Sequence, residues 1–169
     1  MTFHLAQVNI ARMRGSPADP VMNGLVSRIE EMNRLAEQTP GFIWRMKAAE
    51  ATAEALRVFD GWFLPFDAGR LFYNMSVWEN VETLKDYVFR TAHAQLFRQQ
   101  DEWMESLDRA HLALWWIPAG HRPTIAESAE RLRSVQERGA TEFAFTFRQP
   151  FPQPASDSRS LSHQERNSV

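Results

Sequence analysis

Residues 4–13, HLAQVNIARM, alternate between two faces in the manner of a β-strand. One face carries His4, Ala6, Val8 and Ile10, and the other carries Leu5, Gln7 and Asn9. Successive side chains of a strand point to opposite sides, so the pattern predicts a strand at the start of the fold. The turn-forming residues RGSPADP then end it.

Helical and strand patterns take turns along the rest of the chain. Asp19-Pro20 is a favourable helix start, because Asp caps free N–H groups and Pro at the first position loses no hydrogen bond. Apolar residues follow at helical spacing, and the helix is expected to end before Pro40-Gly41. Strands are predicted at 42–47, 70–78 and 111–118.

Helices are also predicted on either side of the fourth strand. Asn80 is expected to cap a helix, and the helical pattern restarts or continues after Arg90 through Leu107. Thr124 with Glu127 has the form of a capping box, in which each side chain bonds a backbone N–H near the other. The helix that they open is expected to end at Gly139.

A fifth strand is predicted at Glu142–Arg148, with Phe143, Phe145 and Phe147 on one face. We expect one domain over 1–152 and a flexible polar tail over 153–169, which is rich in Pro and then in Ser. For residues 48–69 the assignment stays open: the Ala/Glu-rich first half is expected to be a helical turn or a mobile loop, and the second half an irregular aromatic excursion.

The order β-α-β-β-α-β, with an added C-terminal α-β, predicts an α+β protein with a ferredoxin-like arrangement. That arrangement covers one face of the sheet with helices and leaves the other open. The chain has 12 Phe and 6 Trp, so an open sheet face would be a large apolar patch in water. We therefore expect a homodimer in which two sheets pack face to face.

Composition excludes several classes of function. The net charge is −2 without a basic stripe, which argues against nucleic-acid binding. Without cysteine the chain has no disulfide, thiolate metal site or cysteine nucleophile. No apolar run reaches the roughly 20 residues that cross a bilayer. With no signal-peptide pattern, we expect a cytoplasmic protein that does not bind membranes.

Three segments, NMSVWENVETLKDYVFRTAH, LWWIPAGHRPTIAESAERL and AFTFRQPF, resemble the family called domain of unknown function 3291. The resemblance covers roughly residues 3–152. It implies the dimeric α/β-barrel fold of the antibiotic-biosynthesis monooxygenase-like superfamily. Proteins of that superfamily include cofactor-independent oxygenases, isomerases, cyclases and haem-degrading enzymes, so the resemblance implies no single activity.

Polar residues on two strands suggest a site for a small hydrophobic or aromatic molecule on the open face of the sheet. Gln7 and Asn9 share one strand face, and Asn74 and Ser76 share another, between Phe72 and Trp78. If the strand register brings the two sets together, they form an aromatic-walled cavity with a few polar groups. Alternatively, the amides satisfy one another or bridge waters inside a dimer interface. Of Trp115 and Trp116, one is expected in the core and the other, assigned to Trp116, in the site.

His93 is the main candidate for chemistry. Helical spacing places it on the apolar face of its helix, which also carries Leu96, Phe97, Gln100 and Met104. A neutral imidazole there is able to accept a proton from an acidic carbon or phenol. The alternative is a structural histidine bonded to a backbone carbonyl.

Arg90 and the other histidines are weaker candidates. Arg90 is a candidate partner for a substrate oxyanion, although an ion pair with Asp86 is the favoured reading. His121 lies in a turn, and His4 and His111 lie on strands. No two histidines have the short spacing of a zinc site, and no Gly-rich phosphate loop occurs, so we expect neither a metal nor a nucleotide.

Three functions follow from these residues. The first is a small, cofactor-independent enzyme, a monooxygenase, isomerase or cyclase that acts on an aromatic or polyketide-like molecule with His93 and Arg90 as catalytic groups. The second is a non-catalytic dimer that binds a hydrophobic ligand or serves a stress response. The third is a haem protein with His93 as axial ligand.

Overall fold

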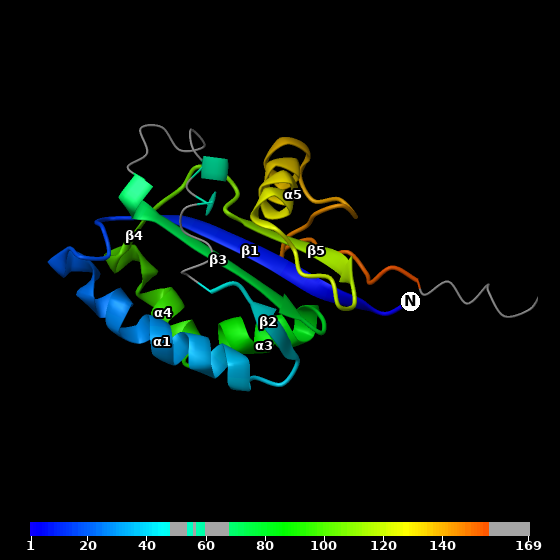
Figure 1. Ribbon diagram of the computed structural model, residues 1–169, viewed down its shortest axis with the longest axis horizontal. Helices are drawn as coiled ribbons and strands as arrows, with labels where there is room; N and C mark the ends of the chain where they lie inside the picture. Colours follow the sequence, from blue (N-terminus) through cyan, green and yellow to red (C-terminus); the bar gives the residue numbers. More distant parts are fainter. Residues whose placement is uncertain (48–53, 56, 60–67, 156–169) are drawn as a thin grey trace, which may run out of the picture.

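The computed structural model describes residues 1–47, 54–55, 57–59 and 68–155 (Figure 1). The expected tail beyond 155, and most of the unassigned stretch 48–69, lie outside these residues. The labelled elements are β1 (Phe3–Met13), α1 (Asn23–Gln38), β2 (Phe42–Arg45), β3 (Leu71–Trp78), α3 (Val81–Arg90), α4 (His93–Arg98), β4 (Met104–Glu105), β5 (Leu112–Pro118) and α5 (Ile125–Arg138). Short 3-10 turns occupy Pro20–Met22, Ala68–Arg70 and Gln100–Glu102. The protein is thus of the mixed α+β class.

The strands form a single antiparallel sheet of five strands within the described residues. β1 is its central strand, with β3 along one edge and β2 beyond β3. The other edge of β1 pairs first with β5 and then, at Arg12 and Met13, with the short β4. All of these pairings are antiparallel.

Side chains on the two faces of the sheet belong to different hydrophobic cores, as the alternation in β1 predicted. Ala6, Val8 and Ile10 are buried in a cluster with Trp115 of β5. Leu5 points to the opposite side and is buried with Trp78, the last residue of β3. Figure 1 shows α1, α3 and α4 below the sheet and α5 above it.

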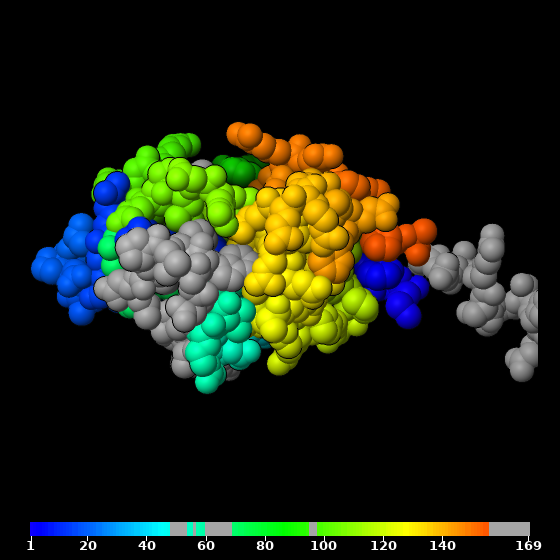
Figure 2. Space-filling model, turned by 90° about the horizontal axis from the view of Figure 1, so that it is seen from above, coloured from blue at the N-terminus to red at the C-terminus, as the bar shows by residue number. Residues whose placement is uncertain are grey.

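Helices cover both faces of the sheet: α1 and α3 lie on the side of Leu5, where we expected the open face, and α5 lies on the other. Its buried residues Ile125, Leu132 and Val135 belong to the same cluster as Val8 and Trp115. Seen from above, α5 and the chain after it lie over the half of the molecule nearer the N-terminus (Figure 2). The expectation of an uncovered face is therefore wrong. The chain supplies a second layer of its own, which removes the stated reason for pairing two sheets face to face.

Two helix starts differ in how their caps form. Asn80 caps α3 as predicted, since its Oδ1 accepts a hydrogen bond from the backbone N of Thr83 at 2.9 Å in a complete capping box. Asp19 makes no such bond to the helix after it. Its carboxylate instead accepts from the backbone N of Ser16 at 2.6 Å and closes the preceding turn.

A break at Thr91 separates α3 from α4, where the sequence left open whether the helix restarts or continues. The Thr91 hydroxyl donates to the backbone O of Tyr87 at 2.6 Å and accepts from the backbone N of His93 at 3.2 Å. A side chain that bonds nearby backbone groups in this way competes with the helix ladder. α4 then ends at Arg98, well before Leu107.

The predicted strand Glu142–Arg148 is wrong, because only isolated bridges join Phe145 to Leu114 and Thr146 to Gln149. Its three phenylalanines do not all share a face, since Phe145 and Phe147 pack in one cluster and Phe143 lies apart from them. Phe143 lies under the guanidinium of Arg131, 3.7 Å from ring centroid to Cζ, on the α5 side. Phe145 is fully buried in the cluster with Leu5. Contacts with Arg131 and with the cluster around Leu5 and Trp78, called the lower core below, therefore hold the segment in an irregular path.

α5 should therefore contribute to stability as a core element. We expect Leu132→Ala to lower the free energy of unfolding by about 2–5 kcal/mol, because it leaves a cavity against the sheet. Val26→Ala on α1 removes a side chain that is 42% exposed and should change it by less than about 0.5 kcal/mol. Urea denaturation measures both. Equal effects would contradict the placement of α5.

Candidate functional site

The register of β1 and β3 brings the predicted polar residues onto one face. Gln7 lies opposite Ser76, and Asn9 lies opposite Asn74. Directly opposed residues of an antiparallel pair point to the same side. This is the side of Leu5 and therefore the side covered by α1 and α3.

The flanking aromatic residues of the predicted site lie on this face as well. Leu5 is opposite Trp78 on one side and Trp116 on the other, so Trp116 faces the lower core and Trp115 faces α5. The Trp116 indole N–H donates to the backbone O of Phe151 at 3.0 Å. Phe72 packs at the far end of the face, where it contacts the cluster around Trp103.

Gln7, Ser76 and Trp78 form a buried hydrogen-bond network. Ser76 Oγ accepts from Gln7 Nε2 at 2.9 Å and from Trp78 Nε1 at 2.8 Å. All three residues are nearly inaccessible to solvent. Two of the polar groups that we assigned to a ligand thus bond to each other, within the core of one chain.

Asn9 differs from Gln7 on the same strand face. Its Oδ1 is buried and has no hydrogen-bond partner among the described residues. Buried polar atoms are normally paired, and an unpaired one costs about 1–3 kcal/mol. The amide of Asn9 is therefore the one predicted polar group here with a buried atom free to accept a hydrogen from another molecule.

His93 is joined to the sheet through two aromatic rings. Tyr87 stacks on Trp78 with centroids 5.1 Å apart, and His93 lies against Tyr87 at 4.8 Å. The Tyr87 hydroxyl donates to the backbone O of Met32 at 3.1 Å, which ties α3 to α1. His93 thus points inward, toward the face that carries Asn9.

A backbone carbonyl fixes the proton on the His93 ring. Nδ1 lies 3.3 Å from the backbone O of Val88, and since a carbonyl only accepts, Nδ1 carries the hydrogen. The neutral ring then has a lone pair on Nε2. Burial lowers the pKa of His93, because desolvation disfavours the imidazolium. His93 is therefore a neutral base at neutral pH.

The remaining predicted residues do not join His93 in the same way. Arg90 Nη1 pairs with Asp86 Oδ1 at 3.0 Å, and the arginine side chain is 80% exposed. Gln100 lies partly buried at the start of a 3-10 turn beyond α4. The side chain of Phe97 falls outside what the structure describes.

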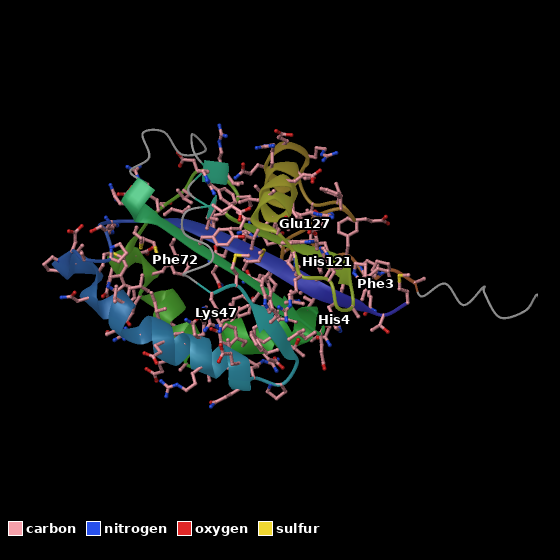
Figure 3. The ribbon with its side chains drawn as sticks, viewed as in Figure 1. Phe3, His4, Lys47, Phe72, His121 and Glu127 are labelled. Carbon is pink, nitrogen blue, oxygen red and sulfur yellow. The ribbon has the colours of Figure 1, made fainter. Side chains whose placement is uncertain are left out.

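Glu127 has a role that the capping-box interpretation missed. Thr124 caps α5 by accepting from the backbone N of Glu127 at 3.1 Å, but the Glu127 carboxylate does not reach back. Its Oε1 accepts from the Trp115 indole at 2.9 Å, and its Oε2 lies 2.8 Å from His121 Nε2. Figure 3 shows His121 and Glu127 together near the start of α5. Because side chains alternate along β5, one of Trp115 and Trp116 has to face α5. A buried indole N–H there needs a hydrogen-bond acceptor, and this need is the signal that points to a residue such as Glu127.

The described residues form neither a metal centre nor a membrane-crossing helix. No group of three or more His, Asp or Glu side chains lies close enough together to hold a metal ion there. In the same part of the chain, no helix is both long enough and apolar enough to cross a bilayer.

Removal of the Ser76 hydroxyl should destabilise the fold. We expect Ser76→Ala to lower the free energy of unfolding by about 1–3 kcal/mol, because the Gln7 amide and the Trp78 indole lose their shared acceptor. Ser27→Ala on the exposed side of α1 is the matched control, with less than about 0.5 kcal/mol expected. Urea denaturation measures the free energy of unfolding of both variants, and an unchanged value in Ser76→Ala would contradict the network.

His93 should make stability depend on pH. Its pKa in the folded state lies below the unfolded value of about 6.5, so the unfolded state binds the proton more tightly. The free energy of unfolding should fall as the pH drops below about 6.5 and level off below the folded pKa. The difference between wild type and His93→Asn, measured by urea denaturation from acid to neutral pH, isolates this contribution. A flat difference would contradict the buried neutral ring.

Comparison with known proteins gives a family but no activity. The family model described as domain of unknown function (DUF3291) matches residues 4–161. The crystal structure of NE2512, a protein of unknown function from Nitrosomonas europaea, is 12% identical with a TM-score of 0.43, over 73% of this chain and 97% of that one. No curated protein matches. Because the family model spans nearly the whole chain, the protein belongs to the DUF3291 family.

Proposed function

We propose that this protein is a small, cofactor-independent enzyme that acts on an aromatic or polyketide-like molecule. His93 is its proton-transfer group, and the substrate lies between α3–α4 and the sheet face that carries Asn9. The observation that carries the proposal is the hydrogen bond from His93 Nδ1 to the Val88 carbonyl. It leaves Nε2 as a lone-pair acceptor on a buried, neutral ring.

The surroundings of His93 suit proton abstraction from a weak acid. A base that stays neutral at working pH is ready to accept a proton without first losing one. Burial, which lowers the pKa of His93, also strengthens the electrostatic contacts that a substrate anion makes. A phenol or an activated C–H is the kind of group that such a base deprotonates.

The sheet face would contribute recognition. Trp78 and Tyr87 form an aromatic wall beside His93, and Asn9 Oδ1 is available to accept from a substrate hydroxyl. Gln7 and Ser76 would act indirectly, by holding the Trp78 indole in place. Arg90 is too exposed, in its pair with Asp86, to meet the same substrate without moving.

The finer fold assignment belongs to this proposal. The strand order β2-β3-β1-β5, with α1 and α3 on one face, supports a ferredoxin-like arrangement with α5 added on the other. Homodimer formation stays a prediction. Since helices cover both faces of the sheet, a dimer would use another surface, such as the outer edge of β2, where Ile43 is 39% exposed.

Haem binding is the second candidate, and the same hydrogen bond favours it. A metal-binding histidine usually donates its other ring N–H to a carbonyl or carboxylate, which fixes the tautomer. His93 Nδ1 meets that requirement through Val88. His93 Nε2 would then be the nitrogen that holds the haem iron.

Oxygen uptake with anthrone tests the enzyme, because anthrone has an acidic C–H and its reaction with O2 yields anthraquinone and water. We expect uptake above the buffer rate and a loss of about 10²-fold or more in His93→Asn, which retains a donor for Val88 but no base. The rate should stay flat above pH of about 6.5 and fall at lower pH, as His93 becomes protonated.

Two controls make the result interpretable. His111→Ala replaces an exposed histidine just before β5 and should keep the wild-type rate. Haemin titration tests the haem alternative. If haem binds His93, a Soret band should form in wild type and disappear in His93→Asn. Wild-type oxygen uptake in His93→Asn would remove His93 from catalysis, and a Soret band of unchanged intensity there would remove it as an axial ligand.

A further inference from the structure

We infer that the groove between β2 and the turn that leads into α5 is a second small-molecule site. It takes an apolar, ring-containing compound that carries one carboxylate. This site does not depend on the proposed function, because its described lining includes neither His93 nor any residue of α3 or α4. Trp44 and Met46, which line it, pack against the α5-side core.

The groove has the size and lining of a ligand site. Its volume is about 640 Å³, within the range of about 300–1,000 Å³ that small-molecule sites occupy. Its lining consists of Glu37, Phe42, Ile43, Trp44, Arg45, Met46, Lys47, Glu54, Arg122, Pro123, Thr124 and Ile125. Among the apolar members, Trp44 supplies an aromatic ring and Pro123 and Ile125 are buried, whereas the Phe42 ring packs edge-on against Trp78. A flat apolar ligand would therefore gain contact area on more than one wall.

Charge at the rim points to an anionic group. Of the three cations that line the groove, Arg45 is already paired, its Nε lying 2.8 Å from Glu37 Oε1. Lys47 and Arg122 are exposed on opposite sides, one after β2 and the other before α5. Glu54 is the remaining acid of the lining, so the unpaired charge is positive. A single carboxylate between Lys47 and Arg122 would balance it.

The Trp115–Glu127–His121 contacts hold one wall of this groove in place. Glu127 bonds the indole of β5 and the ring of His121 simultaneously, and its own backbone N is bonded to Thr124. The turn that carries Arg122 and Thr124 is thereby fastened to both β5 and α5. Figure 3 shows His121 and Glu127 at this position. A wall fixed in advance reduces the entropy that a ligand loses on binding.

Another hollow of about 660 Å³ does not share these properties. It lies between the stretch Asp108–Ala110 and the end of α5, and its lining contains no aromatic side chain. Acids and arginines alternate there, so the hollow has neither an apolar wall nor a clear charge preference. The groove beside β2 is the better candidate on both grounds.

The test is an NMR titration of the full chain with 2-naphthoate. We expect saturable shifts of the Trp44 indole N–H and of the amide signals of Arg122, Thr124 and Ile125. The neutral analogue 2-naphthalenemethanol should bind about tenfold more weakly, since it lacks the charge. No saturable shift at these signals, or equal affinity for both compounds, would overturn the inference.

Variants separate this site from others. Lys47→Ala combined with Arg122→Ala should raise the Kd of 2-naphthoate about tenfold, and Lys47→Arg combined with Arg122→Lys should preserve it. Arg34→Ala, which removes an exposed cation from α1, is the matched control and should leave the Kd unchanged. An unchanged Kd in the double alanine variant would rule out carboxylate recognition.

Two further variants distinguish this site from the proposed active site. His121→Ala should raise the Kd about fivefold, because the turn loses its bond to Glu127. His93→Asn should bind 2-naphthoate like wild type, whatever its effect on oxygen uptake. If His93→Asn abolished binding and shifts appeared at Tyr87 instead, the ligand would lie on the other face and the second site would be refuted.

Discussion

The structure depends on β1, which is paired along both edges and buried on both faces. β3 and β5 bond to it over most of its length, and its side chains enter the two main clusters in turn. A slip of one residue would exchange Gln7 with Val8, which would place an amide in the α5-side core and an isopropyl group beside Ser76. The Gln7–Ser76 hydrogen bond therefore belongs to one register only.

Local sequence patterns predicted the elements better than their arrangement. Alternation located β1 and β3, and the Asn80–Thr83 pair formed the cap expected at α3. The amphipathic pattern of α5 showed that it buries one side but not against which surface, so the expectation of an open sheet face was wrong. At 142–148 the alternating phenylalanines indicated a strand, whereas the position of Phe143 depends on Arg131, which lies far away in sequence.

The candidate site shows the same division between local and long-range information. Strand parity correctly grouped Gln7 with Asn9 and Asn74 with Ser76, and only the register joined the two groups. The missed residue, Glu127, fits a capping box by spacing. A carboxylate has two oxygens that accept hydrogen bonds, and here both face side chains from elsewhere, Trp115 and His121. Spacing alone does not reveal which donors a folded chain presents to a carboxylate.

For His93, the structural and the chemical interpretations describe the same contacts. The bond to the Val88 carbonyl is what a structural histidine makes, yet it also fixes the proton on Nδ1 and leaves Nε2 as an acceptor. Packing against Tyr87 and Trp78 contributes to the core, yet the associated burial lowers the pKa of His93 and keeps the ring neutral. A substitution that only tests stability therefore does not separate the two roles. Asparagine at position 93 separates them, because its amide N–H replaces the donor to Val88 and the side chain has no basic nitrogen.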